Sequence, residues 1–591
     1  MFRQAGVFRD NQQVQERVLD SNPLERERGI TILAKNTAVY WNEVKINIVD
    51  TPGHADFGGE VERILRMVDG VVLLVDAAEG PMPQTRFVTR KALELELLSL
   101  VVINKIDRAD ARPAEVHDEV LELFMDLEAT ERQLDSPFLY AAGRDGWAGD
   151  TPELSEGDLR PLFDGIVSHF PEPEVDPTGP FQMLVSTLDH SSYLGRIAIG
   201  RIERGQVCVG QRVALLDVGS PGMVDDVTEA EEAKVAKLYT FSGLERIEVE
   251  QVNAGDIVAL TGIEGVEIGK TLSDPEHQER LLGIAVEEPT LSMDFTVNNS
   301  PFAGQSGKFV TSRHLRERLY RELEQNVALR VEDTEKPETL TVSGRGELHL
   351  SILIETMRRE GYEFQVSRPR VITRTGVDGE LQEPYEEALI EVPSEMVGTV
   401  IEKLGSRKGE MTDLRPMGDS GTTRLSLRVP ARGLVGYRSE FLTDTRGEGV
   451  LHHQFHSWGT WAGVLQGRGR GVLVADRVGR AVGFALQNLQ ERGTLFVSPG
   501  EEVYGGMIVG ENARPGDLDV NVGKEKKLTN MRAAGSDESI KLEPPRRLTL
   551  EVALEFIEDD ELIEITPDAV RLRKTVLDQN TRKKAVKRAK G

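Results

Sequence analysis

The chain contains one cysteine among 591 residues, so a fold that depends on intramolecular disulfide bonds is excluded. Cys208 stands in the strand-like context VCVG, where a lone cysteine is expected to fill a core rather than act as a nucleophile. No apolar run reaches the roughly 18 residues that a membrane helix needs, and the opening MFRQAGVFRDNQQ lacks an apolar leader segment. We therefore expect a cytoplasmic protein in a reducing compartment, with no membrane partner.

Positive charge is also scarce, because 71 Lys and Arg stand against 99 Asp and Glu and give a net charge of −28. This balance argues against indiscriminate nucleic-acid binding, which needs clustered cations to neutralise phosphates. One local exception runs from Arg571 to Gly591, where nine basic residues stand against a single acidic one, Asp578. We expect this segment to be a solvated, disordered tail that is still able to contact RNA.

The length is several times the usual domain size, so three to five domains with separate cores are expected. Changes of pattern along the chain predict a multidomain protein with five parts: an α/β domain at 1–175, a β-barrel at 178–280, two α+β (ferredoxin-like) domains at 283–371 and 383–465, and a mostly β domain at 466–591. Each α+β domain is expected to hold one helix, at 312–328 and 394–408. The last domain contains a polar, basic stretch at 523–540, expected to be a long exposed loop.

The first domain has the pattern of a parallel sheet with helices between its strands. Lys45–Asp50, Gly70–Asp76 and Leu100–Asn104 are short Val/Ile-rich runs expected for buried parallel strands, and Pro113–Glu128 has helical spacing. A Pro-rich hinge at 171–180 ends the domain. Ligands bind outside the carboxyl ends of the strands in such sheets, which directs attention to the tetrads that follow two of these runs.

DTPGH at 50–54 is the first of these segments. Asp50 can reach a Mg²⁺ ion through water, and the Gly53 amide can meet a γ-phosphate, because only glycine lets the backbone approach so closely. His54 would then lie beside the phosphate. A DxxG pattern occurs often by chance, so this segment alone is weak evidence.

NKID at 104–107 is the second segment. The Asp107 carboxylate can accept both the N1–H and the exocyclic N2–H of guanine, while Asn104 and the aliphatic stem of Lys105 line the base. Adenine lacks this donor pair, so the pattern predicts selectivity for guanine. A charged surface loop is the alternative for NKID alone; its combination with DTPGH and with RERGIT at 26–31 favours a nucleotide site.

These segments resemble a known family. ERERGITI at 25–32, DTPGHADFGGEVER at 50–63 and NKID are similar to the switch I, switch II and base-recognition motifs of the translational GTPases. Later segments, among them VSGRGELHLSILIETMRREGYEF, ARGLVGYRSEF and KKLTNMRAAGSDE, resemble the TypA/BipA family within that superfamily. The likeness runs from near Val7 to about Arg573, and matches of this extent are specific.

The resemblance implies a P-loop-type GTPase domain, a barrel, two domains similar to domains III and V of elongation factor G, and a C-terminal domain peculiar to the family. It also implies a monomeric, ribosome-dependent GTPase that hydrolyses GTP to GDP and phosphate at the factor-binding site and contacts rRNA there. Members of the family are linked to stress and cold adaptation and to assembly of the large subunit.

Site residues follow from the same motifs. The resemblance implies that Thr31 and Asp50 bind Mg²⁺, that Gly53 senses the γ-phosphate and that His54 is the catalytic residue, orienting the attacking water. The implied nucleotide-binding residues are Asp50, Gly53, Asn104, Lys105, Asp107 and the backbone of Ala142. The family tends to have a Ser-Ala pair at this last place, whereas the Ala141-Ala142 pair here keeps the backbone amide and lacks the hydroxyl.

The basic loop carries a further implication, namely contact with the acceptor end of A-site tRNA. The matching positions are Lys524, Lys526, Lys527, Asn530 and Arg532. Phosphate contact by Lys and Arg is compatible with an acidic chain, because a local patch sets the local potential. A merely solvated loop is the alternative.

The phosphate-binding loop GxxxxGK[ST] of such GTPases is not found in this sequence. The nearest segment is EGVEIGKT at 264–271, where Glu264 replaces the first glycine, and its place in the barrel predicts a turn. MFRQAGVF resembles the end of the family's first helix, so we expect the loop to lie upstream of Met1 in an ordinary GTPase whose start is misassigned or trimmed. The alternatives are a ribosome-binding protein deficient in nucleotide binding and a truncated gene product.

The chain as written is expected to have a destabilised first domain, because a missing near-central strand exposes a sheet edge and apolar surface. Residues 178–591 are expected to fold normally. Limited proteolysis under native conditions should therefore degrade the first 175 residues well before the remainder. A cooperative, protease-resistant N-terminal domain in this chain would contradict the expectation.

Overall fold

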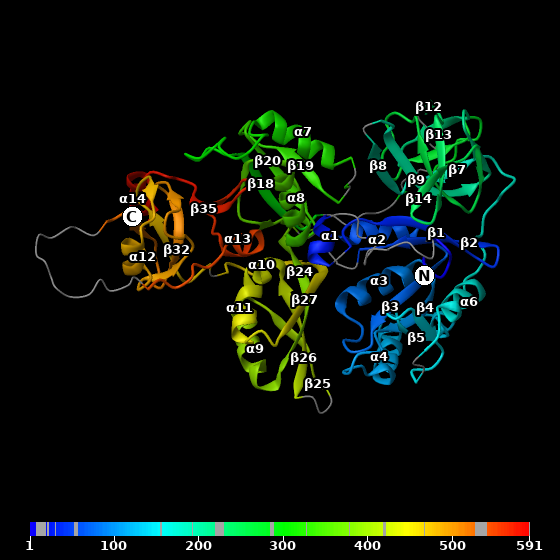
Figure 1. Ribbon diagram of the computed structural model, residues 1–591, viewed down its shortest axis with the longest axis horizontal. Helices are drawn as coiled ribbons and strands as arrows, with labels where there is room; N and C mark the ends of the chain where they lie inside the picture. The colour runs from blue at the N-terminus through cyan, green and yellow to red at the C-terminus, as the bar shows by residue number, and fades with distance from the viewer. Residues whose placement is uncertain are drawn as a thin grey trace, which may run out of the picture. The chain divides into compact units, whose positions relative to one another are not determined.

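The computed structural model describes the chain except for residues 8–18, 20–22, 30, 53–56, 154–155, 192, 219–229, 284–288, 325, 327, 377–378, 418–420, 466, 526–540 and 590–591. The chain forms two compact units, one of residues 1–288 with 322–328 and one of residues 289–321 with 329–591. Figure 1 labels their elements. None of the helices in the described ranges combines the length and the apolar character needed to cross a membrane.

The first unit contains a four-stranded sheet in the order β3-β4-β5-β6. Strands β3 (Gly70–Asp76), β4 (Leu98–Asn104) and β5 (Phe138–Ala142) are parallel, and β6 (Trp147–Gly149) is antiparallel to β5. The predicted parallel strands at 70–76 and 100–104 are confirmed. Alternate β4 residues enter two hydrophobic clusters, one shared with α4 (Pro113–Asp126) and one with α6 (Arg160–His169), so both faces of the sheet are covered.

The segment at 45–50 does not join this sheet, so its predicted parallel pairing was wrong. It belongs to β2 (Val44–Asp50), which pairs antiparallel with β1 (Lys35–Trp41) in a separate two-stranded sheet. The reason is the two-residue turn of Asn42 and Glu43, whose φ angles of 46° and 68° are those of a tight hairpin. At the same time β3 pairs with β4 alone among the described strands, and Leu74 on β3 is 61% exposed.

The β1–β2 hairpin packs between the sheet and the barrel. On the sheet side, the Trp41 ring stacks on Phe163 of α6 at 4.6 Å between centroids, and its Nε1 donates to Asp164 at 2.8 Å. On the barrel side, Ala38 and Val49 enter a cluster of barrel residues, and Ala38 exchanges backbone hydrogen bonds with Gly243. The hairpin therefore shares a core with each neighbour.

Ion pairs reinforce the barrel side. Lys45 Nζ donates to both carboxylate oxygens of Asp256, at 2.8 and 2.7 Å, and the Asn47 amide donates to the same carboxylate at 3.0 Å. Arg201 of the barrel pairs with Asp69, just before β3, at 2.7 Å. These groups are partly buried, so the pairs fix the contact geometry more firmly than fully exposed pairs would.

The barrel itself is confirmed as a β structure at 182–273. Its strands are β7 (Gln182–Leu184), β8 (Thr187–Ser191), β9 (Gly195–Arg204), β10 (Gln206–Cys208), β11 (Arg212–Leu216), β12 (Glu231–Lys234), β13 (Lys237–Ser242), β14 (Glu245–Glu248), β15 (Gln251–Asn253), β16 (Ile257–Thr261) and β17 (Thr271–Ser273). Cys208 ends β10 and is half-buried. Gly269, with φ of 88°, forms the predicted turn before β17.

The second unit begins with β18 (Leu291–Val297), β19 (Arg330–Asp333), β20 (Thr339–Gly344), β21 (Phe364–Val366) and β22 (Arg370–Val371). The expectation of one helix here was wrong. The structure has α7 (Ser312–Glu322), shorter than predicted, and also α8 (Glu347–Glu360), which ends at Gly361 in the left-handed conformation. Helix α8 is buried on most sides, so its sequence lacks the one-sided apolar stripe by which a surface helix is recognised.

The next part of this unit is a sheet of β23 (Arg374–Thr375), β24 (Leu381–Pro393), β25 (Glu410–Met417), β26 (Thr422–Pro430) and β27 (Val450–Thr460). Its predicted helix at 394–408 is present as a short 3-10 turn, Ser394–Met396, followed by α9 (Val397–Ser406). Two further helices, α10 (Ala431–Leu434) and α11 (Tyr437–Asp444), were not predicted. Tyr437 and Phe441 of α11 complete the core over this sheet.

The C-terminal part is mostly β, as expected, with β28 (Val472–Ala475), β29 (Gly479–Arg480), β30 (Gly493–Leu495), β31 (Glu502–Val503), β32 (Met507–Asn512), β33 (Leu518–Val520), β34 (Glu561–Ile565) and β35 (Val570–Lys574). Its helices are α12 (Gly483–Leu489), α13 (Leu550–Phe556) and α14 (Gln579–Ala589). Because β34 pairs with β21, one eleven-stranded sheet runs from β19 to β33.

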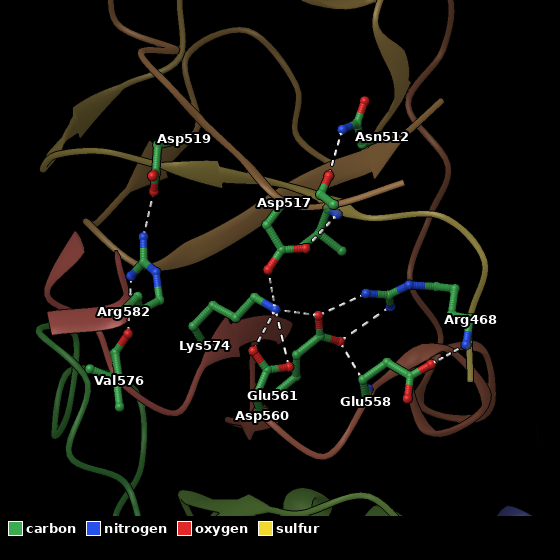
Figure 2. A network of polar contacts seen from close by, with 12 residues as sticks. Arg468, Asn512, Asp517, Asp519, Glu558, Asp560, Glu561, Lys574, Val576 and Arg582 are labelled. Carbon is green, nitrogen blue, oxygen red and sulfur yellow. Dashed lines mark hydrogen bonds and ion pairs between the residues drawn. The ribbon is translucent and has the colours of Figure 1, made fainter. Parts of the chain in front are cut away.

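The basic C-terminal segment is ordered, so the expectation of a disordered tail was wrong. Residues 570–574 form β35, and residues 579–589 form α14. The physical reason is a set of contacts to residues far away in the sequence: Figure 2 shows the Arg582 guanidinium reaching Asp519 of β33 and the Val576 carbonyl. A sequence pattern that is polar all round gives no sign of such docking.

Lys574 is the centre of a buried charge network in the same part (Figure 2). Its ammonium lies 2.6 Å from Asp517, 3.0 Å from Asp560 and 3.0 Å from Glu561, while only 2% of its side chain is exposed. Arg468 pairs with Glu561 as well, at 2.8 Å. Burial would lower the pKa of Lys574, but the charge of Glu561 and the hydrogen bonds that Lys574 donates to Asp517 and Glu561 raise it above its ordinary value.

Substituting Lys574→Met should destabilise the C-terminal part by about 3–5 kcal/mol, because three carboxylates lose their shared cation. Hydrogen exchange of the β32 and β35 amides measures this free energy, and Lys336→Met, which changes an exposed loop lysine, is the control.

The effect of Lys574→Met should depend on pH. Because the pKa of Lys574 is raised in the folded state, its charge stabilises the fold fully below its pKa in the unfolded chain, about 10.4, and this stabilisation is lost as pH rises through the folded-state pKa. The difference should therefore stay constant from about pH 6 to 9 and shrink only at higher pH. Equal hydrogen-exchange protection of these amides in the Lys574→Met and Lys336→Met variants would contradict the expected destabilisation.

Candidate nucleotide-binding site

The carboxyl end of β4 carries the best-defined part of the site. Asn104 is its last residue, and the Asn104 side-chain oxygen accepts the Gly143 amide at 2.9 Å, just beyond the end of β5. A Cβ atom on residue 143 would lie 3.1 Å from that oxygen, tighter than ordinary contacts, so glycine keeps this approach open. The hydrogen bond uses the oxygen of the Asn104 amide and leaves its NH₂ group to act as a donor.

Lys105 follows with φ of 64°, a left-handed conformation that turns the chain away from the strand. Its ammonium lies 2.7 Å from Asp76, the last residue of β3, and its side chain is 56% exposed. Partial burial alone would raise the pKa of Asp76, but the hydrogen bonds from Lys105 and from the amides of Ala78 and Glu79 outweigh burial and lower it. The lysine stem is thereby held across the ends of two neighbouring strands.

Asp107 is exposed, and within the described ranges no hydrogen bond or ion pair to its carboxylate is found. Both its oxygens are therefore able to accept hydrogen bonds from a ligand. Ala142 is fully buried at the end of β5, and its carbonyl accepts the amides of Asp145 and Gly146. The structure thus brings Asn104 and Lys105 together with the turn after Ala142, at one edge of the sheet.

Two contacts from a residue outside the motif support that turn. The Gln4 amide donates to the Gly146 carbonyl at 2.7 Å, and its oxygen accepts the Leu159 amide at 2.7 Å. Gly146 itself has φ of 83°, which glycine adopts without strain. Gln4 therefore bridges the turn beside Ala142 to the residue that precedes α6.

The predicted metal residues lie on a different element. Asp50 ends β2 and is paired in register with Lys35, the first residue of β1, so the segment containing Thr31 leads into the same end of the hairpin that Asp50 occupies. Glu25 of α1 (Pro23–Arg28), which is fully buried, accepts the amides of Ile32 and Leu33 at 3.1 and 3.2 Å. That carboxylate fixes the backbone just after Thr31.

Several predicted site residues lie outside the described ranges. These are Gly53 and His54 of the first domain and Lys526, Lys527, Asn530 and Arg532 of the basic loop. Lys524, just before that segment, is described and exposed. In the described part of the chain no cluster of three metal-ligating side chains is found.

The arrangement fits a guanine base. Asn104 offers an oriented amide, Asp107 offers a carboxylate with both oxygens available, and Lys105 offers an aliphatic stem held by Asp76. Sequence reasoning missed Asp76, Glu25 and Gln4. The sequence did contain a signal for Asp76, because GVVLLVD predicts a strand that ends on an acidic residue, beside the strand that leads into NKID. No local sequence pattern indicated Glu25 or Gln4.

Four family models match successive parts of the chain. They are described as the elongation factor Tu GTP binding domain at residues 1–172, elongation factor Tu domain 2 at 195–273, the elongation factor G C-terminus at 380–468 and the TypA/BipA C-terminal domain at 470–579. Together with the sheet, the barrel and the α+β bodies, these matches define the multidomain architecture of the elongation-factor-type GTPases.

Curated relatives are similar along almost the whole chain. The large ribosomal subunit assembly factor BipA of Escherichia coli K12 is 53% identical over 586 residues, which cover 99% of this chain and 95% of the relative. The Bacillus subtilis 168 protein of the same name is 51% identical, covering 100% and 95%, and that of Synechocystis PCC 6803 is 53% identical, covering 100% and 96%. The chain belongs to the TypA/BipA family.

One solved structure adds to the comparison of folds. A crystal structure of a Thermus thermophilus protein superposes with a TM-score of 0.50 at 17% identity, covering 78% of this chain and 94% of the other. At that identity the similarity concerns the fold alone.

Substituting Asp76→Asn should weaken binding of a fluorescent GDP analogue about three- to tenfold, because Lys105 loses the charge that holds its stem in place. Asp110→Asn is the matched control, since Asp110 is an exposed carboxylate on the same loop that pairs with Arg108. Titration at fixed Mg²⁺ measures both. Equal affinities for the two variants would show that the pair with Asp76 does not position Lys105 for the base.

Proposed function

We propose that this protein is a ribosome-dependent GTPase that hydrolyses GTP to GDP and phosphate and acts in assembly of the large ribosomal subunit. The observation that carries the proposal is the Asn104–Gly143 hydrogen bond beside an exposed Asp107, in a chain more than 50% identical over 99% of its length to a large ribosomal subunit assembly factor. Its place of work would be the cytoplasm, and we propose that it acts there as a monomer.

Guanine recognition rests on donor and acceptor matching. Asp107 would accept the N1–H and N2–H of guanine, while the Asn104 NH₂ group, left over by the bond to Gly143, would donate to an acceptor of the base. Lys105 would cover the base with its stem, and the backbone at Ala142 would border it. Adenine has no donor pair for Asp107, so its binding would leave that carboxylate without partners.

The hydrolytic half of the site combines Thr31, Asp50, Gly53 and His54. Thr31 and Asp50 would hold Mg²⁺, Asp50 through water, and the ion would neutralise charge on the phosphates. The Gly53 amide would donate a hydrogen bond to the γ-phosphate, and His54 would orient the attacking water. Since phosphoryl transfer requires little covalent help from the protein, the rate would depend on how the ribosome positions His54.

RNA contact is assigned to the basic loop, through Lys524, Lys526, Lys527, Asn530 and Arg532. Lys524 is exposed at the described end of this segment, which supports the assignment. The proposed partners are rRNA at the factor-binding site and the acceptor end of A-site tRNA. Stress and cold would be the conditions under which this activity matters, as the family resemblance implies.

The test is GTP hydrolysis, with and without purified ribosomes, by the 591-residue chain and by a version extended upstream by about thirty residues, which would carry the phosphate-binding loop. His54→Ala should lower the ribosome-stimulated rate about 100-fold while leaving GDP affinity unchanged, because the residue acts on the water and not on the base. If ribosomes still stimulate GTP hydrolysis fully in the His54→Ala variant, another residue orients the attacking water. If the chain binds ribosomes and binds no guanine nucleotide, the alternative of a nucleotide-deficient ribosome-binding protein holds.

Base specificity gives an independent check. Asp107→Asn should weaken GDP binding at least about 100-fold and strengthen xanthosine diphosphate binding relative to it, because an amide NH₂ can donate to the C2 oxygen of xanthine. Competition titrations with GDP and xanthosine diphosphate measure this change in base preference. Asp110→Asn serves again as the neighbouring control, and an unchanged preference for guanine would remove Asp107 from the base site.

A further inference from the structure

Helix α14 is fixed to the C-terminal domain at its first turn. The Asp578 carboxylate accepts the amide and the hydroxyl of Thr581, both at 2.7 Å, and so caps the helix. Arg582 binds Asp519 of β33 and donates to the Val576 carbonyl at 3.0 Å (Figure 2). It also donates to the Leu577 carbonyl at 2.6 Å. The first turn therefore has one defined inward side, marked by Arg582.

The opposite side of the helix is basic. At about 100° per residue, position 584 lies almost opposite Arg582 and position 583 lies on the flank between them, and both lysines are exposed. The sequence repeats a basic pair one turn further, at 587 and 588, and contains no Asp or Glu from 579 to 591. Lys583 also lies 3.7 Å from Asp519 but is 62% exposed, so this is a surface pair of small energy that a phosphate can replace.

The strand that holds α14 also leads into the basic loop. Asp519 lies on β33, only four residues before Gly523, where the loop at 523–540 begins. The Arg582–Asp519 contact therefore places the start of α14 beside the strand that leads to the exposed Lys524, a described residue of that loop. The exposed lysines of α14 set a positive local potential on a chain whose net charge is −28.

We propose that the outward face of α14, carried by Lys583 and Lys584, is a second surface that binds the phosphate backbone of RNA, in addition to the basic loop. The inference rests on the proposed function, in which the loop contacts RNA. A helix anchored by Arg582 already holds the backbone that carries these lysines in one conformation, so binding costs less conformational entropy than an unstructured tail would require. A lipid surface is disfavoured, because an interfacial helix needs large apolar residues opposite its lysines and this sequence has none.

The experiment measures binding of the 591-residue chain to three probes, namely purified 50S subunits, protein-free 23S rRNA and deacylated tRNA, over a series of KCl concentrations. The double variant Lys583→Ala/Lys584→Ala removes both charges, and Lys583→Arg/Lys584→Arg keeps them as the matched control. For the alanine pair we expect affinity about tenfold weaker near 0.1 M KCl and a slope of log K against log [KCl] shallower by about 2. The arginine pair should match the unsubstituted chain.

The outcomes separate the sources of phosphate and the two proposals. A loss confined to 50S subunits and 23S rRNA supports rRNA as the ligand, and a loss confined to tRNA supports tRNA. Weaker 50S binding with unchanged binding to both free RNAs points to a ribosomal protein and overturns the inference. If the unsubstituted chain binds and hydrolyses GTP on ribosomes while the alanine pair keeps its slope on every probe, the inference alone fails; if the unsubstituted chain binds no ribosome, the proposed function fails too.

Discussion

The β1–β2 hairpin is the constraint on which the first unit depends. Its two strands share a hydrophobic core with the parallel sheet through Trp41 and another with the barrel through Ala38, so neither neighbour can shift without disturbing it. Lys45 and Asp256 add a charged contact that fixes the register of the hairpin on the barrel. Since Asp50 ends this hairpin and the segment with Thr31 leads into it, a change at the proposed Mg²⁺ residues would reach the barrel through packed side chains.

The second unit is joined by a different means, a sheet that continues between two of its parts. Strand β34 pairs with β21, and the buried Glu564 at this junction accepts hydrogen bonds from Asn298, Ser300 and Tyr504 at 2.7–3.0 Å. Burial and the charge of Glu564 raise the pKa of Tyr504, which therefore stays a neutral donor to that carboxylate. A buried carboxylate with this many donors is costly to expose, so the junction is well specified.

Local pattern predicted the elements whose stability is local. Gly70–Asp76 was predicted to the residue, because a Val/Leu run bounded by glycine and aspartate reads as one buried strand. The strand at 45–50 was found but given the wrong partner, since its composition suits either sheet and the deciding signal was the two-residue turn before it. Helix α8 was missed because it is buried on most sides and shows no one-sided apolar stripe. Helix α14 was missed because its docking depends on Asp519, distant in sequence.

The residues of the candidate site also fall into those that the sequence predicts and those that only the fold reveals. Asn104 and Asp107 were predicted from a short motif after a strand, where residue type and position together indicate the chemistry. Asp76, Glu25 and Gln4 could not be deduced so, because each acts through a contact that only the folded chain creates. Motifs indicate which groups meet the ligand, and tertiary structure decides which groups hold them there.

The pairing of β21 with β34 also sets an order of events during synthesis. Val366 pairs with Ile563, which is added to the chain 197 residues later, and at about 5–20 residues per second this takes roughly 10–40 s. Through that interval the edge of β21 has no partner from this chain, and an unpaired strand edge readily pairs with other molecules. Translation speed over this stretch therefore bears directly on the yield of correctly folded protein.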